Sequence, residues 1–203
     1  MIKLLGKVPD RVYVACSGGP DSMAALNFLN NGRREVMVAH FDHGTEHADD
    51  ARKFIIDYCK KEKLDLQLGT ISRKRLKTES REEFWRNERY HFFKELDAPV
   101  VTAHHLNDVS EWWIFTSLHG TPKLIPYRNE GVIRPFLMTP KQELVRWCSH
   151  HNVSYVKDPT NKNLAYMRNL IRHRIMPQCL KVNPGLSKVL KKKIENSAEH
   201  LAG

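Results

Sequence analysis

The amino-acid sequence predicts an α/β protein with a mostly parallel sheet, flanking helices and a small, basic, mostly helical C-terminal segment. Short runs of β-branched and apolar residues alternate with longer amphipathic stretches through the first part of the chain. Such alternation is typical of βαβ units, which place strands in parallel and cover both faces of a sheet with helices. Beyond residue 133 the composition becomes strongly basic and the strand signals cease.

The individual elements follow from periodicity and turn residues. Asn31 and Gly32 end the first predicted helix, and Phe54, Ile55 and Tyr58 fall on one face of the second. Ligands of parallel sheets bind beyond the carboxyl ends of the strands, so residues directly after each strand are the candidates for a site. We expect strands at residues 11–16, 35–40, 64–68 and 99–103, and helices at residues 22–30, 48–62, 81–96, 108–118 and 140–150.

Charge divides the chain into two parts. Residues 1–133 carry 20 Lys and Arg against 19 Asp and Glu, whereas residues 134–203 carry 13 against 4. We therefore predict a first domain at 1–133 and a basic, mostly helical segment at 134–203 that contacts a polyanion. A solvated basic helix surface is the alternative that charge alone leaves open.

Composition disfavours several classes of protein. The four cysteines are too far apart for a Cys-x-x-Cys unit, so neither zinc nor an iron–sulfur cluster is expected. No segment reaches the ~20 apolar residues of a membrane span, and residues 1–10 lack the apolar region of a signal peptide. The chain is therefore expected to be cytoplasmic and to have no membrane partner.

The segment at residues 17–22 is the first candidate site. It follows a predicted strand and opens a helix, so it offers free backbone N–H groups and the positive end of a helix dipole. Its glycines let a phosphate approach closely, and Asp21 would be repelled by bare phosphates, which indicates a bridging Mg²⁺. No Gly-Lys-Ser/Thr is present, so this is not a Walker A loop. The predicted nucleotide contacts are Ser17, Gly18, Gly19, Pro20, Asp21 and Ser22.

This segment, Ser-Gly-Gly-Pro-Asp-Ser, resembles the PP-loop signature Ser-Gly-Gly-x-Asp-Ser of ATP pyrophosphatases. The resemblance implies a Rossmann-like fold of the adenine nucleotide alpha hydrolase type. It also implies that ATP is split into AMP and pyrophosphate and that the AMP activates a substrate oxygen.

Two further strand ends carry polar motifs, at residues 39–44 and at residues 103–111. In the second motif Asp108 and Glu111 lie three residues apart at a helix start, where one could hold Mg²⁺ and the other orient or deprotonate an amine. Capping of that helix is the alternative for Asp108. A metal pair made by His43 and His47 is disfavoured, because no convincing third ligand lies nearby.

Arginines recur at helical spacing in two places. Arg86 and Arg89 share one helix face, which suits ATP phosphates or an RNA backbone, with surface pairing to neighbouring glutamates as the alternative. Arg168 and Arg172 are four residues apart and face the same way. A solvated amphipathic helix is the alternative for this second pair.

Taken together, these segments resemble the catalytic part of the tRNA(Ile)-lysidine synthetase family along the whole chain. The family patterns have counterparts at residues 40–43, 82–90, 103–111, 133–137, 158–161 and 168–177. Trp112 and Trp113 follow Glu111 where the family usually has Thr, and residues 120–126 replace a glycine-rich stretch. The chain is expected to represent the short form, without the additional C-terminal domains.

The resemblance implies a ligase that uses ATP to adenylate C2 of the wobble cytidine of tRNA(Ile), with a CAU anticodon, and then joins lysine to form lysidine. AMP and pyrophosphate are released; the implied partners are tRNA and lysine, and a homodimer is left open. Two alternatives remain: another PP-loop tRNA-modifying enzyme such as a thiolase, which usually needs a cysteine pair, or a catalytically inactive RNA-binding relative.

The resemblance also implies roles for individual residues. Catalysis falls to Asp21, Asp108 and Glu111, and Mg²⁺ to Asp21 and Asp108. His40 and His104 join the phosphate segment in binding ATP. The implied tRNA contacts are Arg86, Arg89, Arg134, Arg168, Asn169, Arg172 and Arg174.

Overall fold

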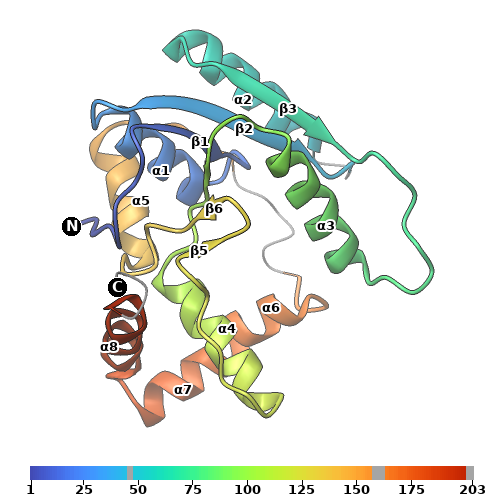
Figure 1. Ribbon diagram of the computed structural model, residues 1–203. Helices are drawn as coiled ribbons and strands as arrows, with labels where there is room; N and C mark the ends of the chain where they lie inside the picture. The colour runs from blue at the N-terminus through green and yellow to red at the C-terminus, as the bar shows by residue number, and fades with distance from the viewer. Residues whose placement is uncertain (45–47, 157–162, 200–203) are drawn as a thin grey trace.

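A computed structural model describes residues 1–44, 48–156 and 163–199 of the chain. His47 and the motif at residues 158–161 lie outside the described residues. Six strands form one sheet in the order β3-β2-β1-β4-β6-β5 (Figure 1). All neighbouring strands are parallel except β5 and β6, so the predicted mostly parallel sheet is confirmed. The strands are β1 (Arg11–Ala15), β2 (Glu35–Asp42), β3 (Leu66–Thr70), β4 (Val100–Val101), β5 (Arg128–Asn129) and β6 (Val132–Ile133).

Helices cover both faces of this sheet. Alternate residues of β1 point to opposite faces, as the strand period of two requires: Val12 and Val14 enter one core, and Tyr13 enters the other. The first core also contains buried residues of α1 (Pro20–Asn30), α2 (Ala48–Glu62) and α5 (Lys141–His150). The second contains Phe93 of α3 (Arg81–Lys94).

The strand order places a crevice between β1 and β4. The chain winds from β1 outward to β3 and then crosses back to β4 on the other side of β1. Connections therefore leave β1 and β4 in opposite directions, which opens a crevice at the carboxyl ends of these two strands. The phosphate segment, residues 17–22, follows β1, and the motif at residues 103–111 begins at the end of β4. The topology therefore brings these two motifs to the same edge of the sheet.

The basic C-terminal segment packs against α4 (Leu106–Leu118) and α1. Leu186, Leu190 and Ile194 of α8 (Leu186–Glu199) form a buried cluster with Leu106 and Val109 of α4. Figure 1 shows α6, α7 and α8 gathered around α4. The predicted domain boundary at residue 133 stays a prediction. Residues of α5, which follows this boundary, pack in the same core as residues of α1. The remaining C-terminal elements are α6 (Met167–Leu170), the π-helical turn η2 (Ile171–Ile175) and α7 (Met176–Val182).

The element boundaries differ from the predicted ones in a few places. The strand predicted at 64–68 is β3 (Leu66–Thr70), and the strand predicted at 99–103 keeps only two paired residues. The β5–β6 hairpin was not predicted, because two-residue strands carry no measurable periodicity. Among the described residues, no helix is both long and apolar enough to cross a membrane.

Candidate active site

The phosphate segment forms a tight turn between β1 and α1. Gly18 has a φ of +82°, which favours glycine, and a Cβ there would come 3.1 Å from Val156. Ser22 closes the turn: its Oγ accepts from the Ser17 amide at 3.2 Å and donates to the Gly19 carbonyl at 3.0 Å. Among the described residues, no side chain caps the amides at the start of α1. Such amides are suited to binding an anion.

Asp21, in the first turn of α1, lies between two cationic or hydrogen-bonding partners. Its Oδ2 is 3.1 Å from Nζ of Lys141 and 3.6 Å from Nε2 of His105. Burial alone would raise the pKa of Asp21, but His105 and Lys141 outweigh it and lower the pKa. The second oxygen, Oδ1, is buried and has no hydrogen-bond partner in the part of the chain that the structure describes. Asp21 is therefore ionised at neutral pH with one oxygen available to a ligand.

His105 connects Asp21 to Asp108. It is the N-cap of α4: the Asp108 amide donates to His105 Nδ1 at 3.3 Å, and Asp108 Oδ2 accepts from the His105 amide at 3.0 Å. Because Nδ1 accepts, this network assigns the imidazole proton to Nε2, which faces Asp21. Helix capping, the alternative considered for Asp108, is thus one of its roles.

Asp108 and Glu111 are held by two arginines from the C-terminal segment. Arg168 donates to Asp108 Oδ1 at 2.7 Å and to Glu111 Oε2 at 3.2 Å. Arg172 donates to Glu111 Oε1 and Oε2 at 2.7 and 2.9 Å. Burial would raise the pKa of Asp108, but His105 and Arg168 lower it to about 2. The structure therefore places these two predicted RNA-contacting arginines against the predicted catalytic carboxylates, although the Arg168 side chain also reaches solvent.

The two histidines predicted to bind ATP border the same crevice. His40, at the end of β2, donates from Nδ1 to the Cys16 carbonyl at 2.8 Å, and its buried Nε2 has no partner. His104 Nδ1 lies 2.8 Å from Thr102 Oγ1. Burial lowers the pKa of His104 to about 3, although Asp108 opposes the shift, and nearby arginines lower it further. The His104 imidazole is thus a neutral hydrogen-bonding group near neutral pH.

A group of arginines surrounds His104 on its other side. Burial lowers the pKa of Arg89, and the charges of Arg86, Arg168 and Arg134 lower it further. Among the described residues, no carboxylate forms an ion pair with Arg89. The predicted alternative of surface pairing with neighbouring glutamates is therefore not seen. An arginine without a carboxylate partner, beside other arginines, is suited to binding an anion.

Two of the predicted tRNA contacts point into the protein. Arg134 is buried and donates to the Pro126 carbonyl at 2.9 Å and to the Tyr90 hydroxyl at 2.6 Å. Asn169 is also buried and donates to the Asn163 carbonyl at 2.9 Å. The structure thus places both side chains where they support neighbouring backbone, whereas Arg174 is exposed.

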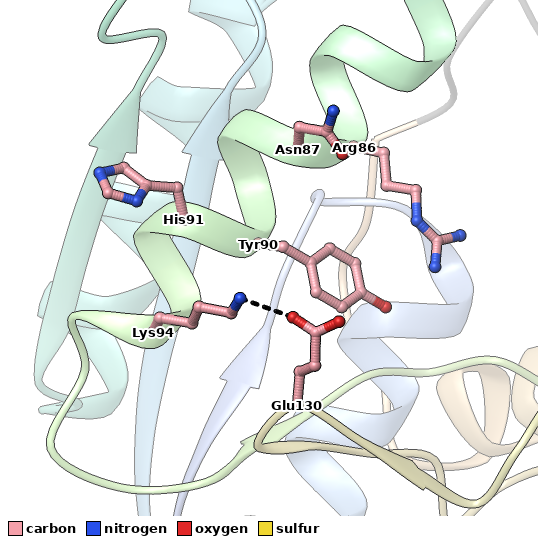
Figure 2. A pocket seen from close by; sticks show the side chains of 6 residues that line it. All are labelled: Arg86, Asn87, Tyr90, His91, Lys94 and Glu130. Atoms are coloured by element: carbon pink, nitrogen blue, oxygen red, sulfur yellow. Dashed lines mark ion pairs between the residues drawn. The ribbon is translucent and has the colours of Figure 1, made fainter.

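A hollow of about 280 Å³ lies beside α3, and none of its lining residues belongs to the phosphate segment. Figure 2 shows the side chains that line it. Its floor includes Tyr90, over whose ring the Arg86 guanidinium lies at 5.1 Å. Lys94 and Glu130 form an ion pair of 2.6 Å across it. This hollow is small and contains none of the buried carboxylates, so we do not place the reaction there.

The donor atoms of the crevice accommodate Mg²⁺ at Asp21 better than at Asp108. Mg²⁺ in nucleotide sites commonly takes one or two carboxylates, with substrate phosphates and water completing its shell. Asp21 Oδ1 is buried without a partner, whereas both oxygens of Asp108 already accept hydrogen bonds. No group of three or more His, Cys, Asp or Glu residues suited to a metal occurs in the part of the chain that the structure describes.

Two residues of this site are not among the predicted site residues. His105 lies in the motif at residues 103–111 without an assigned role, although a side chain three residues before Asp108 at a helix start is a capping signal. Lys141 carried no local signal. It reaches Asp21 because α5 packs beside α1, and its amide donates to Asn107 of α4 at 2.9 Å.

Comparison with known proteins agrees with this geometry. The family model described as a PP-loop domain matches residues 2–179. The tRNA(Ile)-lysidine synthase of Thermotoga maritima is 33% identical over 192 residues, covering 86% of this chain and 46% of the relative. The Bacillus subtilis enzyme of the same name is 32% identical over 210 residues, covering 93% and 44%. The chain spans about half the length of the curated relatives it matches.

Solved structures support the fold. The NH3-dependent NAD synthetase of Campylobacter jejuni superposes with a TM-score of 0.50 at 12% identity, covering 95% of this chain and 87% of the other. At this identity the likeness concerns architecture alone. With a phosphate-binding turn at the β1–β4 crevice and a family model that matches most of its length, the chain belongs to the PP-loop domain family.

Proposed function

We propose that this protein uses ATP to modify the wobble cytidine of tRNA(Ile), joining lysine to it to form lysidine. The observation that carries the proposal is the chain of contacts from Asp21, in the phosphate turn, through His105, Asp108 and Arg168 to Glu111. Carboxylates that could bind an amine, Asp108 and Glu111, are thus connected to a turn that could bind ATP. The curated relatives, named for this activity, support the choice of substrate.

The proposed reaction has two steps. The C2 oxygen of cytosine attacks the α-phosphorus of ATP, and the bond to the bridging oxygen breaks, so that pyrophosphate leaves. The ε-ammonium group of lysine then loses a proton to water, the free amine attacks C2, and AMP leaves with the oxygen. The free amides of α1 bind the phosphates, and His40 Nε2 is available to accept a hydrogen bond from the nucleotide.

The pKa of Asp108 is low, about 2, so this carboxylate is better suited to binding a cation than to accepting a proton from the amine. A general base works best when its pKa lies near the working pH. We therefore assign Asp108 and Glu111 to attracting and orienting the lysine ammonium group. If Arg168 or Arg172 were displaced, a carboxylate oxygen of Asp108 or Glu111 would become free to accept a hydrogen bond from this ammonium group.

Mg²⁺ is part of the proposal, with Asp21 as its protein ligand. Mg²⁺ would neutralise charge on the phosphates and so lower their repulsion of Asp21. Lys141, which contacts the other oxygen of Asp21, would keep this carboxylate oriented.

We propose that Arg86, Arg89 and Arg174 contact phosphates of the RNA. Phosphate contacts position a nucleic acid without reading its sequence. The target base must leave its stack to reach the crevice, as single-stranded RNA readers require. With tRNA as the proposed substrate, we also propose a cytoplasmic location.

Incorporation of labelled lysine tests the proposal. With ATP and unmodified tRNA(Ile) but no lysine, we expect an adenylated RNA to accumulate, and added lysine should convert it to the lysine-containing product. Incorporation of sulfur would instead favour a thiolase, but Cys16, Cys59 and Cys148 are all buried and unpaired. Tight RNA binding without any pyrophosphate release would indicate an inactive relative.

A further inference from the structure

Three rings form a ladder along the outer side of α4. Trp112 stacks on Phe115, with ring centroids 5.6 Å apart and planes at 26°, and Phe115 lies 4.4 Å from His119. The spacings of three and four residues keep the rings on one side of the helix. Trp112 is 38% exposed and His119 is exposed, so the ladder meets solvent. The contact from His119 Nδ1 to the Phe115 carbonyl, 2.8 Å, orients the last ring.

Positive residues contact the helix that carries the ladder. Arg168, whose side chain is 53% exposed, contacts Glu111 of α4, one residue before Trp112 in the chain. Lys123 follows α4 in the chain, and its amide donates to Thr116 Oγ1 of α4 at 2.9 Å. Lys123 is exposed, and no described carboxylate forms an ion pair with it. The helix with the ladder is thus contacted by two cationic residues, one of them at the proposed reaction site.

We propose that this ladder stacks unpaired bases of the RNA, an inference that rests on the proposed tRNA modification. Proteins commonly bind single-stranded nucleic acid with aromatic side chains and nearby cations, because every base has a π-face and every nucleotide has a phosphate. The rings continue from Glu111 away from the crevice. The rings therefore stack on the nucleotides next to the base that enters the crevice, and they keep the anticodon loop of the RNA open.

Substitutions at Trp112 separate stacking from general apolar contact. Trp112→Ala removes the ring, Trp112→Leu keeps apolar area without a π-face, and Trp112→Phe keeps a ring. Leu118→Ala is the matched control, because Leu118 is 68% exposed on the same helix. The probes are unmodified tRNA(Ile) transcript and the same transcript with its anticodon loop annealed to a complementary oligonucleotide.

We expect Trp112→Ala and Trp112→Leu to weaken binding of the free transcript by about 5- to 100-fold, as loss of base stacking does. Trp112→Phe and Leu118→Ala should stay within about 3-fold of the parent protein. The slope of affinity against salt should not change, since no charge is lost. The annealed transcript should bind all four variants and the parent protein alike.

Three results would overturn the inference: binding by Trp112→Leu equal to that of the parent protein, equal losses on both probes, or self-association that Trp112→Ala abolishes in sedimentation. The last result would show an interface between copies of this chain. Lysine incorporation by the parent protein keeps the two proposals separate. Trp112-dependent loop binding without incorporation would refute only the proposed function, and incorporation with unaltered affinity in Trp112→Ala would refute only the stacking.

Discussion

Arg172 contacts Glu111 through two nitrogens, Nε to Oε1 at 2.7 Å and Nη2 to Oε2 at 2.9 Å. The pair joins the C-terminal segment to the helix that follows β4. The Glu111 side chain is 5% exposed and that of Arg172 24%, so water screens the contact only in part. An arginine and a carboxylate in such two-point contact are strongly oriented. The basic segment is therefore part of the candidate active site, and substitutions within it act on both structure and chemistry.

We expect Arg172→Ala to lower the free energy of unfolding by about 2–4 kcal/mol, because it leaves the Glu111 carboxylate buried with one partner fewer. Arg168→Ala should cost less, about 1 kcal/mol, since the Arg168 side chain is 53% exposed. Urea denaturation of both variants gives the comparison. A double-mutant cycle with Glu111→Gln should show coupling above about 1 kcal/mol. Additive effects in that cycle would mean that the pair does not stabilise the fold.

Arg174 offers a cleaner test of RNA binding. It is exposed, and no described carboxylate pairs with it. We predict that Arg174→Ala weakens tRNA binding by about 1–3 kcal/mol and lowers the salt slope by about one, without changing the melting temperature. Affinity measured between low and physiological salt decides this. Arg33→Ala, at an exposed position on the turn between α1 and β2, is the control. An unchanged slope would remove Arg174 from the RNA contacts.

Asp21→Asn should reduce ATP-dependent pyrophosphate release by a factor of about 100 or more, since a neutral amide is a poor ligand for Mg²⁺ and a poor partner for Lys141. The melting temperature should change little, because the Asp21 side chain is 26% exposed and the substitution keeps its shape. Normal turnover at limiting Mg²⁺ would contradict the assigned role. Asp10→Asn, at an exposed carboxylate before β1, provides the control.

The buried histidine next to the arginines predicts a pH effect on stability. The pKa of His104 is lowered to about 3 from an unfolded value of about 6.5, so below pH 6.5 the unfolded chain binds the proton more readily. Stability should therefore fall as pH drops below 6.5, by up to about 1.4 kcal/mol per pH unit from this group. His104→Gln should remove that component between pH 6.5 and 4.5, where Asp108 does not yet titrate.

Unfolding free energies of the parent protein and His104→Gln, measured at several pH values in this window, give the two slopes. His43 has a pKa lowered to about 4, chiefly by burial, so the variant keeps a smaller slope of the same sign. Parallel curves for the two proteins would show that His104 titrates normally. His91→Gln, at an exposed histidine on α3, is the matched control substitution.

Local sequence determined the parts of this protein that depend on neighbouring residues. A glycine pair between a β-branched strand and a helix start makes the phosphate turn, because backbone freedom and free amides arise within six residues. The alternation of strands and helices determined the class of fold and the edge of the sheet at which the motifs meet. The spacing of Asp108 and Glu111 determined that both carboxylates face the same side of α4.

Only the tertiary structure decided what those carboxylates contact. Arg172 and Lys141 reach the site because η2 and α5 are packed against α4 and α1, and hydrophobic contacts do not specify in advance which charges they bring together. A basic helix facing water and one facing buried carboxylates have the same composition. Arg168 and Arg172 therefore looked like RNA contacts in the sequence, whereas burial of Asp108 and Glu111 requires counter-charges that these arginines supply.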